Sequence, residues 1–467
     1  MSEETLISTT FSHQIPVCGL GITISSGRPR INNLKLSPGI LHLLNNISHG
    51  AFHNALERYP PPKCHPDTRK AVLQRILHWI EASGNEQDNR VLWLHGPAGA
   101  GKSAIAQTVS EHCAETKELA ASFFFSRLEP YRNNASRLWA TIAFQLSMTT
   151  PVLRNKIKKA VEDDPSIFFR SLDDQLRMLI IEPLSISEQV PTDVQQKSPF
   201  IVIIDGLDEC KNEEEQRYII LSIARLIDSY RLPLHFMVAS RPEPQIWRAF
   251  DHLSLRHIRY HISLDQWLSP VADIHTFLRD GFDKLCEKHS STLASVPRPW
   301  PPDNVGQLLA ERSCGQFIYA ATVLKFVDDE DYWPKDQLEH ILDASSSSAF
   351  AELDQLYQQI FSTGKHISLL CKIIGCILVA KQPLSVPDIE TLLGLRQGEV
   401  RLVLRRMHSL LEVPVSSTQP IKTHHASLED FIFNPARAGI YYIKRSDCHL
   451  AIARGCVQLL RQMLQAA

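Results

Sequence analysis

The sequence has no closely spaced pair of cysteines, no excess of charge of one sign and no apolar run long enough to span a membrane. Each absence excludes a class of protein. Its ten cysteines include no C-x-x-C pair, so neither a zinc site nor a disulfide framework is expected. With 49 basic and 51 acidic residues the formal net charge is −2, which attracts neither nucleic acid nor an anionic membrane. The most apolar stretch, residues 367–380, is too short to span a bilayer, and the amino terminus opens no apolar signal segment. We therefore expect a cytoplasmic protein with no membrane span.

The chain has the composition of a globular protein. Its 467 residues are 44% hydrophobic and 21% charged. Because a domain takes roughly 150 residues, we expect about three domains. Between residues 91 and 262, short apolar runs alternate with stretches of helical periodicity. The runs lack polar alternation, which indicates strands covered on both faces and hence a mostly parallel sheet in an α/β sandwich. The predicted strands are Val91–His95, Ala120–Phe125, Phe200–Ile204, Leu234–Ala239 and Ile258–Ile262.

Changes of pattern divide the chain further. The first 60 residues mix Ser, Thr, Gly and Pro with short apolar clusters, whereas helical periodicity dominates after residue 262. Near the end, two helical stretches precede a candidate hairpin at residues 413–415 and 421–423, an order that suggests a winged helix. We predict a weakly structured leader with one helix (1–60), the α/β domain (61–262), helical subdomains (263–364) and a winged-helix-like region with a C-terminal helix (365–467).

A glycine-rich segment follows the first predicted strand and precedes a good helix start. It fits the pattern G-x-x-x-x-G-K-[ST], which predicts a phosphate loop, because glycines let backbone N–H groups approach phosphate oxygens and the helix adds partial positive charge. Lys102 would reach the β- and γ-phosphates of ATP or ADP, and the Ser103 hydroxyl would ligate Mg²⁺. The predicted α/β domain is therefore a P-loop NTPase sandwich. The residues expected at the phosphates are Gly96, Pro97, Ala98, Gly99, Ala100, Gly101, Lys102, Ser103 and Ala104.

Charged residues follow two further predicted strands. Asp205, Asp208 and Glu209 come after the third strand, and Arg241 comes after the fourth. The carboxyl ends of parallel strands form the ligand-binding edge of such a sheet. Asp205 is placed to hold Mg²⁺ together with Ser103, and Asp208 or Glu209 to orient or deprotonate an attacking water. Arg241 is placed to sense the γ-phosphate or to stabilise charge in the transition state.

Together, Gly96–Ser103, the phrase IVIIDGLDEC around Asp205–Glu209, and Ser240-Arg241-Pro242 resemble the NACHT family of signal-transduction ATPases of the STAND class. The likeness is greatest to its fungal, nephrocystin-like branch. It covers about residues 63–461. Three further segments also resemble that branch, namely Cys64–Trp79, Ala121–Ser126 and Gly315–Thr322.

This resemblance implies a nucleotide switch with slow ATPase activity. ADP would hold a closed monomer, and exchange for ATP would release a homo-oligomer that signals, in fungi as part of innate immunity or self/non-self recognition. The family places a winged-helix histidine against the bound diphosphate in a pattern like H-x-S-F-x-D-F, which His425 matches, with Leu428 replacing the aromatic residue and His424 as a neighbouring candidate. The Thr68-Arg69 stretch resembles the segment that packs near the base. Relatives commonly continue into sensor repeats, so the sensor is expected to be missing, external or truncated.

Two other functions stay open from the residues. A small-molecule kinase would use the same loop to turn over a second substrate, and a scaffold would bind nucleotide without hydrolysing it. The helical and winged-helix appendages favour a switch over a kinase, and the complete set of motif residues favours hydrolysis over a scaffold. Arg401, Arg405 and Arg406 form a short basic patch typical of a solvated helix face, so nucleic acid is not an expected partner.

The intact phosphate loop generates a first prediction. Lys102→Ala removes the main cationic contact to the β- and γ-phosphates, a charge-assisted contact of roughly 1.5–3 kcal/mol, so affinity for ATP and ADP should fall about tenfold or more. Titration of the folded variant with both nucleotides measures this. Unchanged affinity would contradict the assignment.

Overall fold

The computed structural model describes residues 37–82, 89–127, 129–149, 151–185, 200–230, 232–264, 270–342 and 349–466, together with three strands before residue 32. The predicted leader is therefore described only in part. Contacts divide the chain into two compact units, one formed by Met1–Ile47 with Ser136–Val190 and the other by Ser48–Ala135 with Pro191–Ala467.

The first unit contains the predicted leader helix and a small sheet that the sequence did not reveal. Its three strands run antiparallel in the order β1-β2-β3. β1 and β3 are only three and four residues long, whereas the six residues of β2 alternate between Leu or Ile and small or polar residues, a signal that the sequence prediction missed. In α5 every fourth residue from Leu153 to Val161 is buried, and this helix packs on α1 and α4. The elements are β1 (Ile15–Val17), β2 (Leu20–Ser25), β3 (Arg28–Ile31), α1 (Pro38–Asn45), α4 (Leu138–Thr149), α5 (Pro151–Asp163), α6 (Leu172–Leu176), a π-helical turn (Arg177–Ile181) and α7 (Glu182–Ser185).

The second unit is built on a five-stranded parallel sheet in the order β5-β6-β7-β4-β8. This confirms the predicted α/β fold, with each strand within one residue of its expected bounds. The strands are β4 (Val91–His95), β5 (Leu119–Phe124), β6 (Phe200–Asp205), β7 (Leu234–Ser240) and β8 (Arg259–Ser263). The helices between and beside them are α2 (Lys70–Ala82), α3 (Lys102–Glu115), α9 (Glu213–Asp228) and α10 (Pro244–Phe250).

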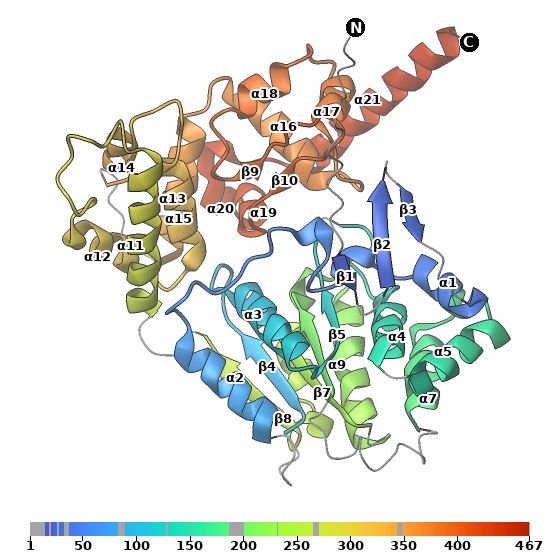
Figure 1. The fold of residues 1–467 in the computed structure, drawn as a ribbon. Helices are drawn as coiled ribbons and strands as arrows, with labels where there is room; N and C mark the ends of the chain where they lie inside the picture. Colours follow the sequence, from blue (N-terminus) through green and yellow to red (C-terminus); the bar gives the residue numbers. More distant parts are fainter. Residues whose placement is uncertain are drawn as a thin grey trace, which may run out of the picture. The chain divides into compact units, whose positions relative to one another are not determined.

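The central strands are apolar throughout because both faces of the sheet are buried. All five residues of β4 and all seven of β7 are buried. Alternate residues of a strand point to opposite faces. One set, with Leu92, Leu94 and Met237, packs against α2 and α3, which lie in front of the sheet in Figure 1. The sheet therefore presents only its edges and strand ends to ligands.

The chain after residue 269 is mainly helical, as predicted. One continuous cluster of buried apolar side chains runs from α11 to α21, and the boundary predicted at residue 364 falls within it. The elements are α11 (Pro270–Lys288), α12 (Asp303–Arg312), α13 (Phe317–Val327), α14 (Pro334–Leu342), α15 (Ala349–Ser362), α16 (Ile367–Val379), α17 (Val386–Leu393), α18 (Glu399–Leu404), β9 (Leu411–Glu412), β10 (Lys422–Thr423), α19 (Ser427–Ile432), α20 (Pro435–Ala438) and α21 (Arg445–Ala466).

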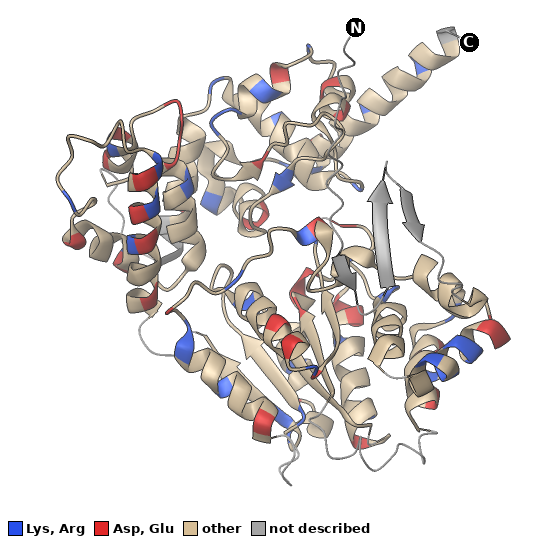
Figure 2. Cartoon of the chain, in the orientation of Figure 1, with Lys and Arg blue, Asp and Glu red and all other residues tan. Residues whose placement is uncertain are grey.

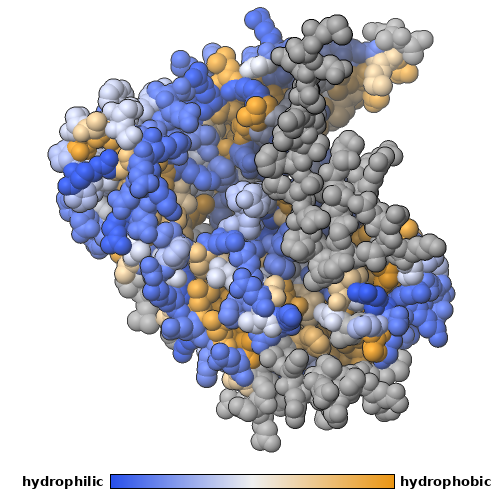
Figure 3. Space-filling view, in the orientation of Figure 1, coloured by the Kyte–Doolittle hydropathy of each residue, from blue (hydrophilic) through white to orange (hydrophobic). Residues whose placement is uncertain are grey.

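The predicted hairpin is present, but its first strand lies two residues earlier than expected. Glu412 pairs with Lys422 in the antiparallel ladder. Pro414 explains the shift, since proline has no N–H to donate and ends the ladder before it. Beyond the hairpin, the end of α21 carries exposed apolar side chains, including Leu460 and Leu464 (Figure 3). Among the described helices none combines the length and apolar character needed to cross a bilayer.

Candidate functional site

The glycine-rich segment connects β4 to α3 as the sequence predicts. Gly99 and Gly101 have φ of 76° and 89°, the left-handed region that favours glycine. A Cβ atom on Gly99 would lie 2.1 Å from Cγ2 of Ile318, at the start of α13. The amide of Ile318 also donates to the Gly99 carbonyl at 3.3 Å. The loop is therefore supported by the helical region after the sheet as well as by the strand before it.

Lys102 closes this loop from within. Its Nζ donates to the carbonyl oxygens of Gly96 and Pro97, both at 2.8 Å. Burial lowers the pKa of Lys102, while the nearby carboxylates of Asp208 and Asp205 act in the opposite direction. The two carbonyl oxygens thus hold the amine at the centre of the loop, where it can meet phosphate oxygens.

Asp205 is the last residue of β6, and its surroundings fit a divalent cation. Its side chain is 4% exposed and accepts a hydrogen bond from the Ser103 hydroxyl. Burial raises the pKa of Asp205 to about 6. Its Oδ1 is buried without a hydrogen-bond partner among the described residues, which is costly for a polar atom. A carboxylate oxygen beside a hydroxyl is a donor set that Mg²⁺ accepts, so the pair predicted from the sequence fits this ion.

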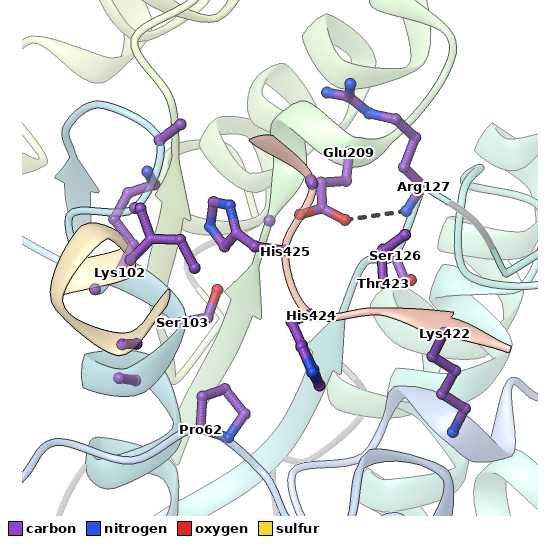
Figure 4. A pocket seen from close by; sticks show the side chains of 18 of the residues that line it. Pro62, Lys102, Ser103, Ser126, Arg127, Glu209, Lys422, Thr423, His424 and His425 are labelled. Atoms are coloured by element: carbon purple, nitrogen blue, oxygen red, sulfur yellow. Dashed lines mark hydrogen bonds between the residues drawn. The ribbon is translucent and has the colours of Figure 1, made fainter. Parts of the chain in front are cut away.

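Asp208 and Glu209 lie in one short turn (Leu207–Glu209) but differ in their partners. Asp208 accepts the backbone N–H of Arg241 at 2.9 Å and lies 3.2 Å from its Nε. Glu209 accepts the backbone N–H of Arg127 at 3.0 Å (Figure 4). Burial, followed by the charge of Asp208, raises the pKa of Glu209 to about 7. The geometry therefore separates two residues that the sequence left interchangeable: Asp208 positions Arg241, and Glu209 is the candidate base.

A carboxylate from the C-terminal region reaches this edge of the sheet. Asp430, on α19, lies 2.5 Å from Nη1 of Arg241 through one oxygen. Its other oxygen accepts from Nη1 of Arg127 at 3.2 Å. Glu429 lies 3.8 Å from the same Arg127 nitrogen. Although burial alone would raise it, the pKa of Asp430 is held below its ordinary value by Arg241 and Arg127, so the carboxylate is charged at neutral pH.

The two adjacent histidines have different environments. His425 lies among the residues around Lys102 and Ser103 (Figure 4), and the pKa of its ring is lowered to about 3, first by burial and then by Arg241 and Lys102. His424 instead contacts the His408 carbonyl through Nε2 at 2.9 Å. The structure thus brings His425, rather than His424, toward the phosphate loop. Its contact with a diphosphate stays a prediction.

Apart from Asp430, these groups line one cavity of about 600 Å³. Its wall includes the phosphate loop, the ends of β5 and β6, α13 and the segment of residues 421–429, so it could enclose a nucleotide. Arg69 braces the wall, because its Nη2 donates to the Ala100 carbonyl at 2.8 Å and its backbone N–H to Asp273 at 2.9 Å. Cys64 and Thr68 line the cavity beside it.

Sequence reasoning missed several charged residues of the site. Arg127, Arg132 and Asp430 lie within the predicted domains, and Arg58 lies in the predicted leader. Arg58 stacks on the Phe124 ring, with its guanidinium carbon 3.5 Å from the centroid. The position of Arg127 just after a strand was a usable signal. No motif marked Arg58 or Arg132, and nothing local marked Asp430, because its two arginine partners lie 189 and 303 positions away in the sequence.

The basic patch of α18 is engaged within the protein. Arg405 donates to both oxygens of Asp331 at 2.7 Å. Arg401 and Arg406 donate to the carbonyls of Val415 and Thr363. Charges of both signs are interspersed over the elements seen in Figure 2. The Arg405 side chain is 62% exposed, which agrees with the expected solvated face, but each of the three guanidiniums also has a partner within the protein.

Comparison with known proteins agrees with the geometry of the loop and the sheet. The family model described as nephrocystin 3, N-terminal, matches residues 67–241, which contain the phosphate loop, the carboxylates after β6 and Arg241. The chain contains a P-loop NTPase domain. No curated protein sequence matches this NTPase.

Three solved structures are similar to this P-loop NTPase over most of its length. Cdc6p from Pyrobaculum aerophilum is 11% identical, with 84% of this chain and 97% of that one covered and a TM-score of 0.36. Orc1 from Aeropyrum pernix, solved in complex with DNA, is 17% identical, with 80% and 93% covered and a TM-score of 0.36. Drosophila ORC bound to DNA is 12% identical, with 81% and 97% covered and a TM-score of 0.38. TM-scores below 0.5 give these likenesses no weight for function.

The different partners of the two carboxylates generate a second prediction. Glu209→Gln should leave ATP binding near normal and slow hydrolysis by about 10²–10⁴, the scale of general-base loss. Because a base must be deprotonated, the wild-type turnover number should rise with pH through the pKa of Glu209, about 7, and level off above it. A pH profile of phosphate release measures both effects.

Asp208→Asn is the matched control for this experiment. Its pH profile should still show an inflection, since the base remains, but at lower pH, because the charge of Asp208 no longer raises the pKa of Glu209. A profile that loses its inflection in Asp208→Asn and keeps it in Glu209→Gln would reverse the two roles.

Proposed function

We propose that this chain is a nucleotide-dependent signalling switch of the NACHT type, within the STAND class. It binds ADP and ATP with Mg²⁺ and hydrolyses ATP slowly. In the ADP state the winged-helix-like region is closed on the NTPase domain, and in the ATP state it opens and copies of the chain assemble. A cytoplasmic location and a role in fungal immunity or self/non-self recognition belong to the same proposal.

The observation that carries the proposal is the carboxylate of Asp430, shared between Arg241 and Arg127. Arg241 follows β7 and Arg127 follows β5, so one side chain of α19 bonds to two separate strand ends of the nucleotide edge. An arginine held in this way is not free to meet a γ-phosphate. A γ-phosphate would compete for the same guanidinium, because bidentate arginine recognises phosphate and carboxylate alike. Nucleotide state and closure are thereby coupled.

The chain's own residues supply the rest of the mechanism. Lys102 meets the β- and γ-phosphates, and Ser103 with Asp205 holds Mg²⁺, which neutralises charge on those phosphates when bound. Glu209 takes a proton from the attacking water once it is deprotonated. Its hydrogen bond from Arg127 holds one of its oxygens in the closed arrangement, which supports slow turnover.

The kinase alternative has less support. A second substrate would have to approach the γ-phosphate at the strand ends, where α19 places Asp430 and Glu429 against the two arginines. The scaffold alternative leaves unexplained why Glu209 lies on the cavity wall with its pKa raised toward neutrality.

The shared carboxylate generates a third prediction. Asp430→Asn removes the charge that holds both arginines, and each charge-assisted contact is worth roughly 1.5–3 kcal/mol. ADP release should therefore become about tenfold faster or more, and the variant should assemble at lower ATP concentration. Stopped-flow release of a fluorescent ADP and light scattering in ADP and in a non-hydrolysable ATP analogue measure the two effects.

Asp331→Asn is the matched control. It breaks another bidentate pair of the C-terminal region, with Arg405, that touches none of the site residues described above. ADP release and assembly should stay at the wild-type level. If Asp430→Asn behaves like the wild type in both assays, Asp430 does not couple nucleotide state to closure, and the proposal would be overturned.

A further inference from the structure

The ring of His425 has a defined acceptor side. Its Nδ1 accepts the backbone N–H of Ser427 at 3.0 Å, and the Ser427 hydroxyl oxygen lies 2.7 Å from the same nitrogen. A ring nitrogen that accepts an N–H carries no proton of its own. In the neutral imidazole the proton must then be on Nε2, on the opposite side of the ring.

A buried tyrosine extends this arrangement into the helical region. The hydroxyl of Tyr357, on α15, lies 2.7 Å from the Ser427 hydroxyl. Since Nδ1 is an acceptor, the Ser427 hydroxyl must donate to it and must therefore accept from Tyr357. Burial raises the pKa of Tyr357, so this hydroxyl keeps the proton that it donates. The three groups form a chain of hydrogen bonds with one direction, from Tyr357 through Ser427 to His425.

The helix that carries Tyr357 is held rigidly against the same segment. Asp354, one turn earlier on α15, makes a bidentate pair with Arg437 at 2.7–3.1 Å. Gln358, the residue after Tyr357, donates to the Arg437 carbonyl at 2.8 Å. Positions 354, 357 and 358 share one helix face. The Tyr357 ring also packs edge-on against Phe431, with centroids 5.2 Å apart.

We propose that Tyr357 and Ser427 are positioning residues that fix His425 in the tautomer with its proton on Nε2, so that it donates a hydrogen bond to the β-phosphate of bound ADP. The other tautomer would present a lone pair to the phosphate and repel it. The chain of hydrogen bonds from Tyr357 through Ser427 thus determines whether His425 attracts or repels the diphosphate. The inference rests on the proposed function, and it adds α15 to the elements that sense the nucleotide.

A double-mutant cycle tests the relay, by which we mean the chain of hydrogen bonds from Tyr357 through Ser427 to His425. Tyr357→Phe removes one hydroxyl and keeps the ring that packs on Phe431. ADP release should become about 2- to 12-fold faster, the range for loss of one net hydrogen bond. In a His425→Leu background the same substitution should change ADP release by less than about twofold, because the relay has no remaining target. An equal effect in both backgrounds would mean that Tyr357 acts only on stability, and would overturn the inference.

The tautomer itself supplies a second readout. Ring ¹⁵N chemical shifts of His425, assigned by comparison with His425→Leu, should show a protonated Nε2 in the wild type. In Ser427→Ala only the backbone N–H of residue 427 still donates to Nδ1, so the share of the tautomer with its proton on Nδ1 should increase. Tyr441→Phe is the matched control, because it removes a tyrosine hydroxyl from the same buried cluster without touching the relay. It should leave both the shifts and ADP release unchanged. A wild-type tautomer in Ser427→Ala would overturn the relay.

The two proposals fail differently. The tautomer can be measured without nucleotide, so a protein that binds no ADP would refute the proposed function while the ring shifts still decide the relay. If ADP release depends on His425 but the effects of Tyr357→Phe and His425→Leu on it are additive, the proposed switch would stand and the relay would be refuted.

Discussion

The rest of the site depends on one electrostatic arrangement, the carboxylate of Asp430 between two arginines. Arg241 and Arg127 end separate strands of the sheet and point to the same place. Removing water from guanidinium groups is costly unless a carboxylate compensates them, and an unpaired buried charge is worse than no charge. The side chains of Arg241 and Arg127 are only 16% and 23% exposed. Docking of α19 therefore satisfies two cations that the sheet alone would leave with fewer partners.

Burial also shifts the pKa values of Asp205, Glu209 and Lys102. It raises the pKa of Asp205 to about 6 and of Glu209 to about 7, and lowers the pKa of Lys102. Each shift weakens the charge that the group needs for work on phosphate. A bound nucleotide with its cation would reverse the shifts of Asp205 and Lys102, since Mg²⁺ favours the ionised form of Asp205 and phosphate favours the charged form of Lys102. In the proposed switch, the charges of these groups would therefore change when nucleotide binds.

The helical region also contacts the loop itself. Ile318 lies against Gly99, and Arg69 joins the loop carbonyl of Ala100 to Asp273 on α11. On the other side, α15 reaches His425 through Tyr357 and Ser427. Of the elements after the sheet, α13 therefore contacts the phosphate loop directly, while α11 and α15 are linked to the loop and to His425 through Arg69 and Ser427. In the proposed switch, a change at the phosphates would act on helices that share one continuous apolar core, and such a core repacks between discrete arrangements rather than deforming gradually.

The sequence by itself determined the parallel sheet, the phosphate loop and the carboxylates after β6, because these features are local: apolar runs, glycine positions and residues next to strand ends are all legible in short windows. It placed the hairpin and singled out two histidines. The family resemblance already favoured His425. Only the tertiary structure gave His425 and His424 different surroundings, separated Asp208 from Glu209, and joined Asp430 to Arg241 and Arg127. Those contacts link residues up to 303 positions apart, and their energy depends on burial and on partners brought together by packing, which no local pattern encodes.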